Sequence, residues 1–166
     1  MACSLWLSPP EPLYGRLSGL IGALASRLGT EAFAPHITLL SGLAGDGLDA
    51  RLLRLGRGLA PFEVRLQGVG LGTEFFHCVF AGAASTPALL AARSRATEVF
   101  GVGGSEAFDP HLSLAYGNLG SAEKNAARAA AGDLAALSFS VDSIDLMDTG
   151  GEVARWRRLA RVPLSS

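Results

Sequence analysis

Apolar residues recur at every third or fourth position early in the chain, which is the spacing of an amphipathic helix. This pattern predicts a helix over Leu13–Leu28 that ends at Gly29. Similar spacing after a proline or a polar residue predicts three further helices. These helices are expected over residues 46–57, 86–100 and 121–131. A capping-box pattern that starts at Ser121 opens the last of them.

Short runs of β-branched, aromatic and aliphatic residues lie between turn signals and predict strands. The expected strands cover residues 4–7, 33–40, 62–71, 74–81, 107–115, 139–147 and 153–164. A tight turn at Gly72 and Thr73 is expected to join the third and fourth strands, and the glycine-rich residues 101–105 predict a loop. Strands and helices mixed in this order predict an α+β fold.

One five-residue pattern occurs twice. Residues 35–39 read Pro-His-Ile-Thr-Leu, and residues 110–114 read Pro-His-Leu-Ser-Leu. The two histidines lie 111 − 36 = 75 residues apart, close to half of the 166-residue chain. We therefore expect residues 1–166 to form a single domain of two intertwined lobes related by a pseudo-twofold axis. Each lobe would be an antiparallel sheet with flanking helices, and the active site would lie in the cleft between them.

The side chains within each copy of this pattern point to phosphate chemistry. In a strand, residues i and i+2 face the same side, so His36 lies beside Thr38 and His111 beside Ser113. Two imidazoles near neutral pH can activate water on one side of a cyclic phosphodiester and protonate the leaving oxygen on the other. The two hydroxyls can donate to the non-bridging oxygens. A single histidine of this kind is more often structural, but two matched copies favour catalysis.

Composition and charge limit the classes of partner. Charged residues make up 17% of the chain and the net charge is −1, which disfavours an extended surface for DNA or other nucleic acids. A pocket for a small nucleotide needs only local positive character and is still possible. No heptad pattern or large apolar stripe stands out, so a monomer is expected.

The remaining patterns predict a cytoplasmic protein without a metal or cofactor. The N-terminus lacks the basic and apolar regions of a signal peptide, and no apolar run approaches the roughly 20 residues that span a membrane. Cys3 and Cys78 do not form a CxxC pair, which disfavours a thiolate metal site. HxH, HExxH and P-loop motifs are also absent from the sequence.

The pair of H-x-[ST] motifs resembles the 2H phosphoesterase superfamily, and more narrowly the cyclic nucleotide phosphodiesterases of plants and yeast. The resemblance covers essentially the whole chain. It rests on the first strand with Trp6, on residues 35–39, 73–80, 109–116 and 146–150, and on Trp156.

This resemblance implies hydrolysis of nucleoside 2′,3′-cyclic phosphates to 2′-phosphates. It also implies hydrolysis of ADP-ribose 1″,2″-cyclic phosphate, a by-product of tRNA splicing, to the 1″-phosphate. His36 and His111 would be the acid–base pair, and Thr38 and Ser113 would bind the phosphate. The expected order has His111 as the base and His36 as the acid, although the sequence leaves this order open.

Three aromatic residues are expected to contact the substrate. Tyr116 lies five residues after His111, so it needs a bulge or the end of the strand to turn inward. Trp6 would stack on a base, with a core position as the alternative. Phe76 is favoured over Phe75 for the cleft, on the assumption that both lie in a strand.

Two further side chains, His77 and Trp156, are expected to have structural roles. His77 stands where a glutamine is usual in the family, and it is expected to be a satisfied polar side chain near the cleft. Trp156 lies among arginines, and alternation within a strand would turn Trp156 inward and the arginines outward.

Two other functions stay open at this point. One is RNA-end processing, as in the bacterial 2′-5′ RNA ligases and U6-type exonucleases of the same superfamily, which would want a basic groove. The other is a non-catalytic module that binds nucleotides.

Overall fold

The computed structural model describes residues 1–104 and 106–166. Its helices are α1 Leu13–Leu28, α2 Leu48–Gly56, α3 Pro87–Phe100, α4 Ser121–Ala131 and the short 3₁₀ helix η1 Val153–Arg155. Its strands are β1 Cys3–Leu7, β2 Ile37–Leu43, β3 Phe62–Glu74, β4 His77–Ala83, β5 His111–Ala115, β6 Ser138–Val141, β7 Ser143–Asp148 and β8 Arg157–Pro163. The expected loop at 101–105 is observed over residues 101–104, and Ser105 lies outside the described residues.

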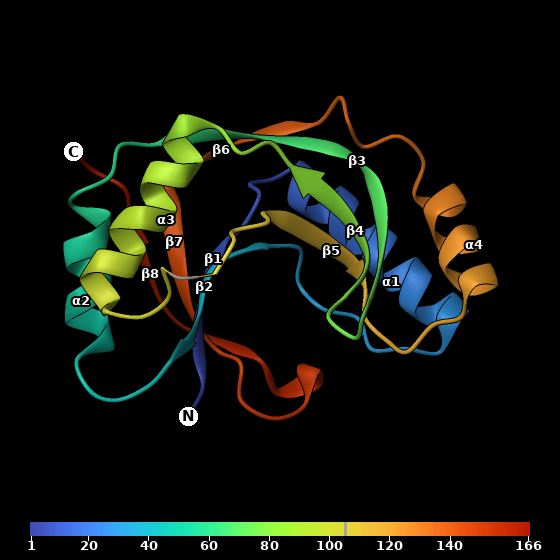
Figure 1. Cartoon of the computed structure of the whole chain (residues 1–166), viewed down its shortest axis with the longest axis horizontal. Coiled ribbons are helices and arrows are strands. Elements are labelled where there is room, and N and C mark those ends of the chain that lie inside the picture. Colours follow the sequence, from blue (N-terminus) through green and yellow to red (C-terminus); the bar gives the residue numbers. More distant parts are fainter. Residues whose placement is uncertain (105) are drawn as a thin grey trace.

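The eight strands form one antiparallel, curled sheet in the order β6-β3-β4-β5-β2-β1-β7-β8 (Figure 1). Strands β5 and β2 meet at its centre through one registered pair, Ile37 opposite Leu112. On one side of this junction, α1 and α4 pack against the β5 half of the sheet; on the other, α2 and α3 pack against the β2 half. The predicted two-lobed α+β fold is confirmed.

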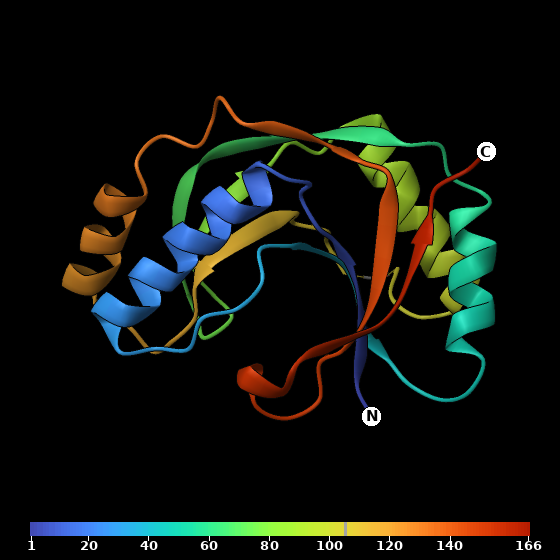
Figure 2. The ribbon, with the colours of Figure 1, turned by 180° about the vertical axis from the view of Figure 1, so that it is seen from behind.

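Each lobe takes helices from both halves of the chain. Helix α1 follows β1 but packs against β5, whereas α3 follows β4 but packs against β2 (Figures 1 and 2). The apolar faces of these two helices, including Leu17 of α1 and Leu89 of α3, are fully buried. The connection from β1 to α1 and the connection from β4 to α3 cross between the lobes in opposite directions. The lobes are therefore intertwined around the central pair β2 and β5.

Both long helices have the predicted ends. Gly29 ends α1 in a left-handed conformation with φ of 66°, which glycine adopts at little cost. The Thr86 side chain accepts a hydrogen bond from the backbone of Leu89 at the start of α3. Helix α4 differs from the prediction in its cap: Gly120, not Ser121, is the N-cap, and Glu123 accepts the Gly120 N–H at 2.8 Å.

Two strand predictions are wrong. The turn between β3 and β4 lies at Phe75 and Phe76, and Gly72 lies within β3, where a Cβ would collide with the His77 carbonyl. Residues 139–147 form two strands rather than one. The strand is interrupted at Asp142, where the chain crosses from β6 at one edge of the sheet to β7 in the other lobe. The apolar alternation continues through the break, so the pattern does not reveal it.

The strands of the two histidine motifs, β2 and β5, begin later than predicted. Strand β2 starts at Ile37, directly after His36, and β5 starts at His111 itself. The expected strand at 153–164 begins with η1, and β8 starts at Arg157. Within the described part of the chain, every helix is too short or too polar to cross a membrane.

Candidate active site

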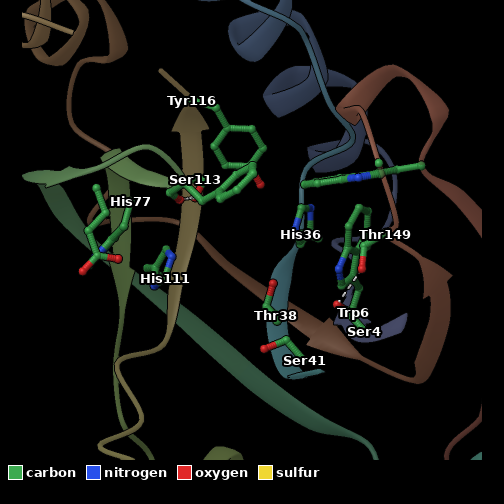
Figure 3. A pocket seen from close by; sticks show the side chains of 14 residues that line it. Ser4, Trp6, His36, Thr38, Ser41, His77, His111, Ser113, Tyr116 and Thr149 are labelled. Atoms are coloured by element: carbon green, nitrogen blue, oxygen red, sulfur yellow. Dashed lines mark hydrogen bonds between the residues drawn. The ribbon is translucent and has the colours of Figure 1, made fainter. Parts of the chain in front are cut away.

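A pocket of about 560 Å³ opens between the two lobes (Figure 3). It is lined by Ser4, Trp6, His36, Thr38, Ser41, Glu74, Phe76, His77, His111, Ser113, Tyr116, Thr149, Gly151 and Trp156. Strand β2 carries Thr38 on one wall, and β5 carries His111 on the opposite wall (Figure 3). All seven side chains predicted to form the site line this one pocket.

His36 is held from two sides. Its Nδ1 atom lies 2.7 Å from the carbonyl oxygen of Ala34, and its ring stacks on Trp6 with centroids 3.4 Å apart and planes 4° apart. A carbonyl can only accept a hydrogen bond, so Nδ1 carries the proton and Nε2 keeps its lone pair. The stack accounts for the buried position of Trp6, which is 3% exposed.

Burial sets the charge of His36. Loss of solvent is the largest effect on the pKa of this imidazole, and the nearby His111 acts in the same direction. The hydrogen bond to the Ala34 carbonyl, which is the second-largest effect, and the carboxylate of Asp145 oppose them, and the net result is a pKa lowered to about 4. His36 is therefore neutral near pH 7.

His111 repeats this arrangement in the other lobe. Its Nδ1 atom lies 2.8 Å from the carbonyl oxygen of Asp109, two residues earlier, as Ala34 is for His36. The same tautomer follows, with the Nε2 lone pair unused by this bond. The two histidines differ in exposure, because His36 is buried and His111 is half-buried.

Hydroxyl groups accompany both histidines. Thr38 lies on β2, two residues after His36, and Ser113 lies on β5, two residues after His111. The Ser113 hydroxyl donates to the carbonyl oxygen of Phe76 at 3.1 Å. It must rotate from this bond to donate to a phosphate oxygen.

Aromatic side chains form the far end of the pocket. Tyr116 follows the last residue of β5, so the end of the strand turns it inward, as one of the predicted alternatives required. Its ring stacks on Phe33 with centroids 3.7 Å apart. Burial raises the pKa of the Tyr116 phenol, so this group stays a neutral hydrogen-bond donor and acceptor.

Trp156 is a pocket residue, and its assignment to an alternating strand is wrong. It follows η1 and precedes β8, where it reaches the rings of Trp6, Phe76 and Tyr116. The centroid distances are 5.8, 5.9 and 5.9 Å. No local signal in the sequence separates this tryptophan from a strand residue.

Phe76 lines the pocket, but not for the predicted reason. It sits in the turn between β3 and β4, not in a strand, and 53% of its surface is exposed. Phe75 packs edge-on against it, with ring centroids 4.9 Å apart. The rings of Phe76 and Tyr116 pack edge-on with centroids 5.1 Å apart, so Phe76 forms the rim of the aromatic end of the pocket.

His77 lies beside His111, with ring centroids 4.1 Å apart. Burial lowers the pKa of His77, and the neighbouring His111 lowers it further. Its Nε2 atom is buried and makes no hydrogen bond to any described residue, although Asp109 Oδ2 lies 3.7 Å away. The expectation of a polar side chain near the cleft is confirmed, but the expectation that it is satisfied is wrong.

Asp145 is a buried charge behind the site that the sequence analysis missed. It pairs with Trp6 across β7 and β1. Its carboxylate accepts hydrogen bonds from Arg161 at 2.6 and 2.8 Å and from the Ser8 hydroxyl at 2.9 Å. A bidentate pair of this kind fixes both partners, so Asp145 supports the strand that holds Trp6 under His36.

Among the described residues that line the pocket there is no lysine or arginine. Its ionisable side chains other than Tyr116 are the three histidines and Glu74. A phosphate in this pocket would therefore meet imidazoles and hydroxyls rather than fixed cations.

Comparison with known proteins gives relatives along nearly the whole chain. Residues 9–152 match the family described as the 2′-5′ RNA ligase superfamily. A protein of Arabidopsis thaliana named cyclic phosphodiesterase is 30% identical over 155 residues, which cover 90% of this chain and 86% of that protein.

Solved structures share the fold at lower identity. The protein TT0787 of Thermus thermophilus aligns with a TM-score of 0.65 and 22% identity, over 99% of this chain and 98% of that one. E. coli LigT complexed with 3′-AMP aligns with a TM-score of 0.62 and 14% identity, with the same coverage of both chains. The two-lobed architecture is thus found in other proteins.

Proposed function

Because the chain belongs to the 2′-5′ RNA ligase superfamily of 2H phosphoesterases, enzymes that hydrolyse phosphodiesters, we propose that it hydrolyses cyclic phosphodiesters with His36 and His111 as an acid–base pair. One observation carries this proposal. The two imidazoles come from opposite lobes, and each uses Nδ1 to bind the carbonyl two residues earlier. Each therefore offers Nε2 to the same pocket.

The proposed reaction uses both nitrogen atoms in one displacement at phosphorus. The base takes a proton from water, and the water oxygen forms a bond to phosphorus. The bond from phosphorus to one ribose oxygen breaks, and the acid gives that oxygen its proton. Thr38 and Ser113 donate hydrogen bonds to the non-bridging oxygens, where negative charge increases. No step in this scheme requires a metal ion.

Burial favours His36 as the base, which reverses the order expected from the sequence. With a pKa of about 4, His36 is neutral near pH 7, and a neutral imidazole is the form that accepts a proton. The ring of Trp6 lies against His36 and stabilises the imidazolium that forms during the reaction. His111, which is more open to solvent, then serves as the acid.

The aromatic end of the pocket supports a nucleotide as substrate. Tyr116, Phe76 and Trp156 surround the space beyond the histidines, and such rings stack on any base. We propose nucleoside 2′,3′-cyclic phosphates, opened to 2′-phosphates, and ADP-ribose 1″,2″-cyclic phosphate, opened to the 1″-phosphate. The name of the Arabidopsis relative supports the cyclic diester.

RNA-end processing and nucleotide binding without catalysis are the competing functions. The scarcity of cationic side chains in the described pocket lining disfavours a groove for a long RNA backbone. Two complete histidine motifs, each with the same bond from Nδ1 to a backbone carbonyl, disfavour a binding module without catalysis, because nucleotide binding alone does not require both.

The test is turnover of 2′,3′-cyclic AMP and ADP-ribose 1″,2″-cyclic phosphate in the presence of EDTA, followed by phosphorus NMR. We expect 2′-AMP and the 1″-phosphate from the wild type, and neither product from His36→Ala or His111→Ala. Folded wild-type protein that converts neither compound would contradict the proposal, as would loss of turnover on addition of EDTA.

A further inference from the structure

Three side chains lie close together on one side of the pocket, and one of them is His111 of the proposed catalytic pair. His77, Asp109 and His111 each offer a ligand atom, and these atoms all lie within 4.8 Å of one another. His77 begins β4, His111 begins β5, and Asp109 lies two residues before β5. Because β4 and β5 are neighbours in the sheet, His77 and His111 share one wall of the pocket (Figure 3).

The chemistry of these atoms is that of a zinc site. Two imidazole nitrogens and one carboxylate oxygen are ligands that zinc takes at about 2.0–2.2 Å, and a fourth position stays open to water. Tetrahedral ligands at that distance lie about 3.4 Å apart. Asp109 Oδ2 and His77 Nε2 are 3.7 Å apart, close to this spacing, and side-chain rotations are needed to bring all three atoms from within 4.8 Å of one another to it.

Two further features suit metal binding. Metal-bound histidines usually donate their other ring N–H to a carbonyl or carboxylate, which fixes the free nitrogen toward the metal. His111 already makes this bond, from Nδ1 to the Asp109 carbonyl oxygen at 2.8 Å. His77 contributes a buried Nε2 atom that has no hydrogen-bond partner within the part of the chain that the structure describes. Leaving a buried polar atom unpaired is unfavourable, and a bound ion would offset this cost.

We propose that His77, Asp109 and His111 bind one zinc ion, and that this ion inhibits the enzyme. The inhibitory effect rests on the proposed function, whereas the binding does not. A zinc ion on Nε2 of His111 occupies the lone pair that this residue needs in order to carry and transfer a proton. The acid–base pair would then lack one member until the metal leaves.

Binding is tested first, without substrate. Chelator-treated protein is titrated with zinc in competition with a fluorescent zinc indicator. We expect one zinc per chain for the wild type and at least about tenfold weaker binding for His77→Gln and for Asp109→Asn. Glu74→Gln is the matched control, because Glu74 faces His77 in the β3–β4 pairing and its replacement removes the same charge, but it lies outside the ligand set.

Two binding results would overturn the site: no stoichiometric zinc on the wild type, or equal affinity in wild type and His77→Gln. Equal weakening in Glu74→Gln would also do so, because it would reduce the effect to general charge.

Inhibition is tested separately, with each variant compared with its own metal-free rate. We expect zinc to stop turnover of 2′,3′-cyclic AMP by the wild type at concentrations that fill the site, and His77→Gln to need at least about tenfold more. Activation by zinc, or full turnover by zinc-loaded wild type, would overturn the inhibitory role. Metal-free wild type that turns over no cyclic phosphate would instead refute the proposed function, and the titration would still decide the site.

Discussion

His36 and His111 occupy matching positions in the two lobes but different environments. Both bind a backbone carbonyl through Nδ1, yet only His36 is buried against an indole ring. The five-residue patterns that contain them are nearly the same, so the difference comes from their tertiary surroundings, which for His36 include the stacked ring of Trp6 on another strand. Tertiary packing, rather than the motif, therefore separates the proposed base from the proposed acid.

The order of base and acid can be tested with the leaving group. A p-nitrophenyl diester of a nucleotide leaves without protonation, so its cleavage needs the base but not the acid. We expect His111→Ala to lose about 10²–10⁴-fold on 2′,3′-cyclic AMP but far less on this diester. His36→Ala should lose activity on both. Rescue of His36→Ala, but not of His111→Ala, would restore the order expected from the sequence.

The burial of His36 also predicts how stability depends on pH. Its pKa is about 4 in the folded protein and 6.5 when exposed, so the unfolded chain binds an extra proton between these values. Stability therefore falls as the pH is lowered from 6.5 toward 4, by at most about 1.4 kcal/mol per unit. Above pH 6.5 the ring is neutral in both states and this contribution is constant.

Urea unfolding across this pH range would measure the effect. His36→Gln removes the titrating ring, so its free energy of unfolding should depend less steeply on pH than that of the wild type. Equal slopes for the two proteins would show that His36 is not held neutral.

Most of the site could be predicted from the sequence because it lies in one repeated pattern. The repeat identified His36, Thr38, His111 and Ser113, and the structure brings these four to one pocket. The environment of Asp145 depends on the pairing of β7 with β1 and β8, and that of Trp156 depends on contacts with Trp6, Phe76 and Tyr116. No local pattern encodes either. The cluster around His77 was missed for the same reason, since its members become neighbours only when β4 pairs with β5.

At the scale of elements, the junction of β2 and β5 holds the two halves of the sheet together. A single registered pair joins these strands, and its members, Ile37 and Leu112, directly follow His36 and His111 in the chain. Both side chains are fully buried. The packing that joins the lobes thus also sets the spacing of the two imidazoles.

Leu112→Ala tests this coupling. Removal of a buried leucine side chain should lower the free energy of unfolding by about 2–5 kcal/mol. Because the junction loosens, we expect turnover of the folded variant to fall as well. Leu114→Ala is the matched control, since Leu114 is equally buried on the same strand but lies outside the registered pair. Similar stability loss with equal turnover in both variants would contradict a positioning role for the junction.

Helices were easier to predict than strand breaks. The boundaries of α1 and α4 agree with the prediction, because the apolar spacing is long and glycines mark their ends. The division of residues 139–147 into β6 and β7 was missed, since alternation continues on both sides of Asp142. Which lobe each half joins depends on sheet order, and that is a property of the whole chain.

At the scale of the whole molecule, the pocket exists only because the lobes are intertwined. One wall comes from β2 and β1, and the other comes from β5 and β4 (Figure 3). The segment between β7 and β8 adds Trp156. Residues from both ends of the chain thus meet around one small space. The repeated five-residue pattern predicts the two walls, but not the segment between β7 and β8 that adds Trp156.

Replacement of Trp156 tests this third contribution. Stacking of a base on an aromatic ring is worth about 1–3 kcal/mol, so Trp156→Leu should raise KM for 2′,3′-cyclic AMP by about tenfold or more, with a smaller change in kcat. Arg155→Ala is the control, because that neighbouring side chain is 79% exposed and lies outside the pocket lining. Unchanged KM in Trp156→Leu would remove this residue from the substrate site.

The most direct test of the central claim is the turnover number on 2′,3′-cyclic AMP for wild type, His36→Ala, His111→Ala and the double variant, each checked for folding by circular dichroism. Two groups that act in one displacement lose their effect together. The account predicts that each single variant falls nearly as far as the double variant. Losses that multiply in the double variant, or one single variant with near wild-type turnover, would contradict a shared reaction of the two histidines.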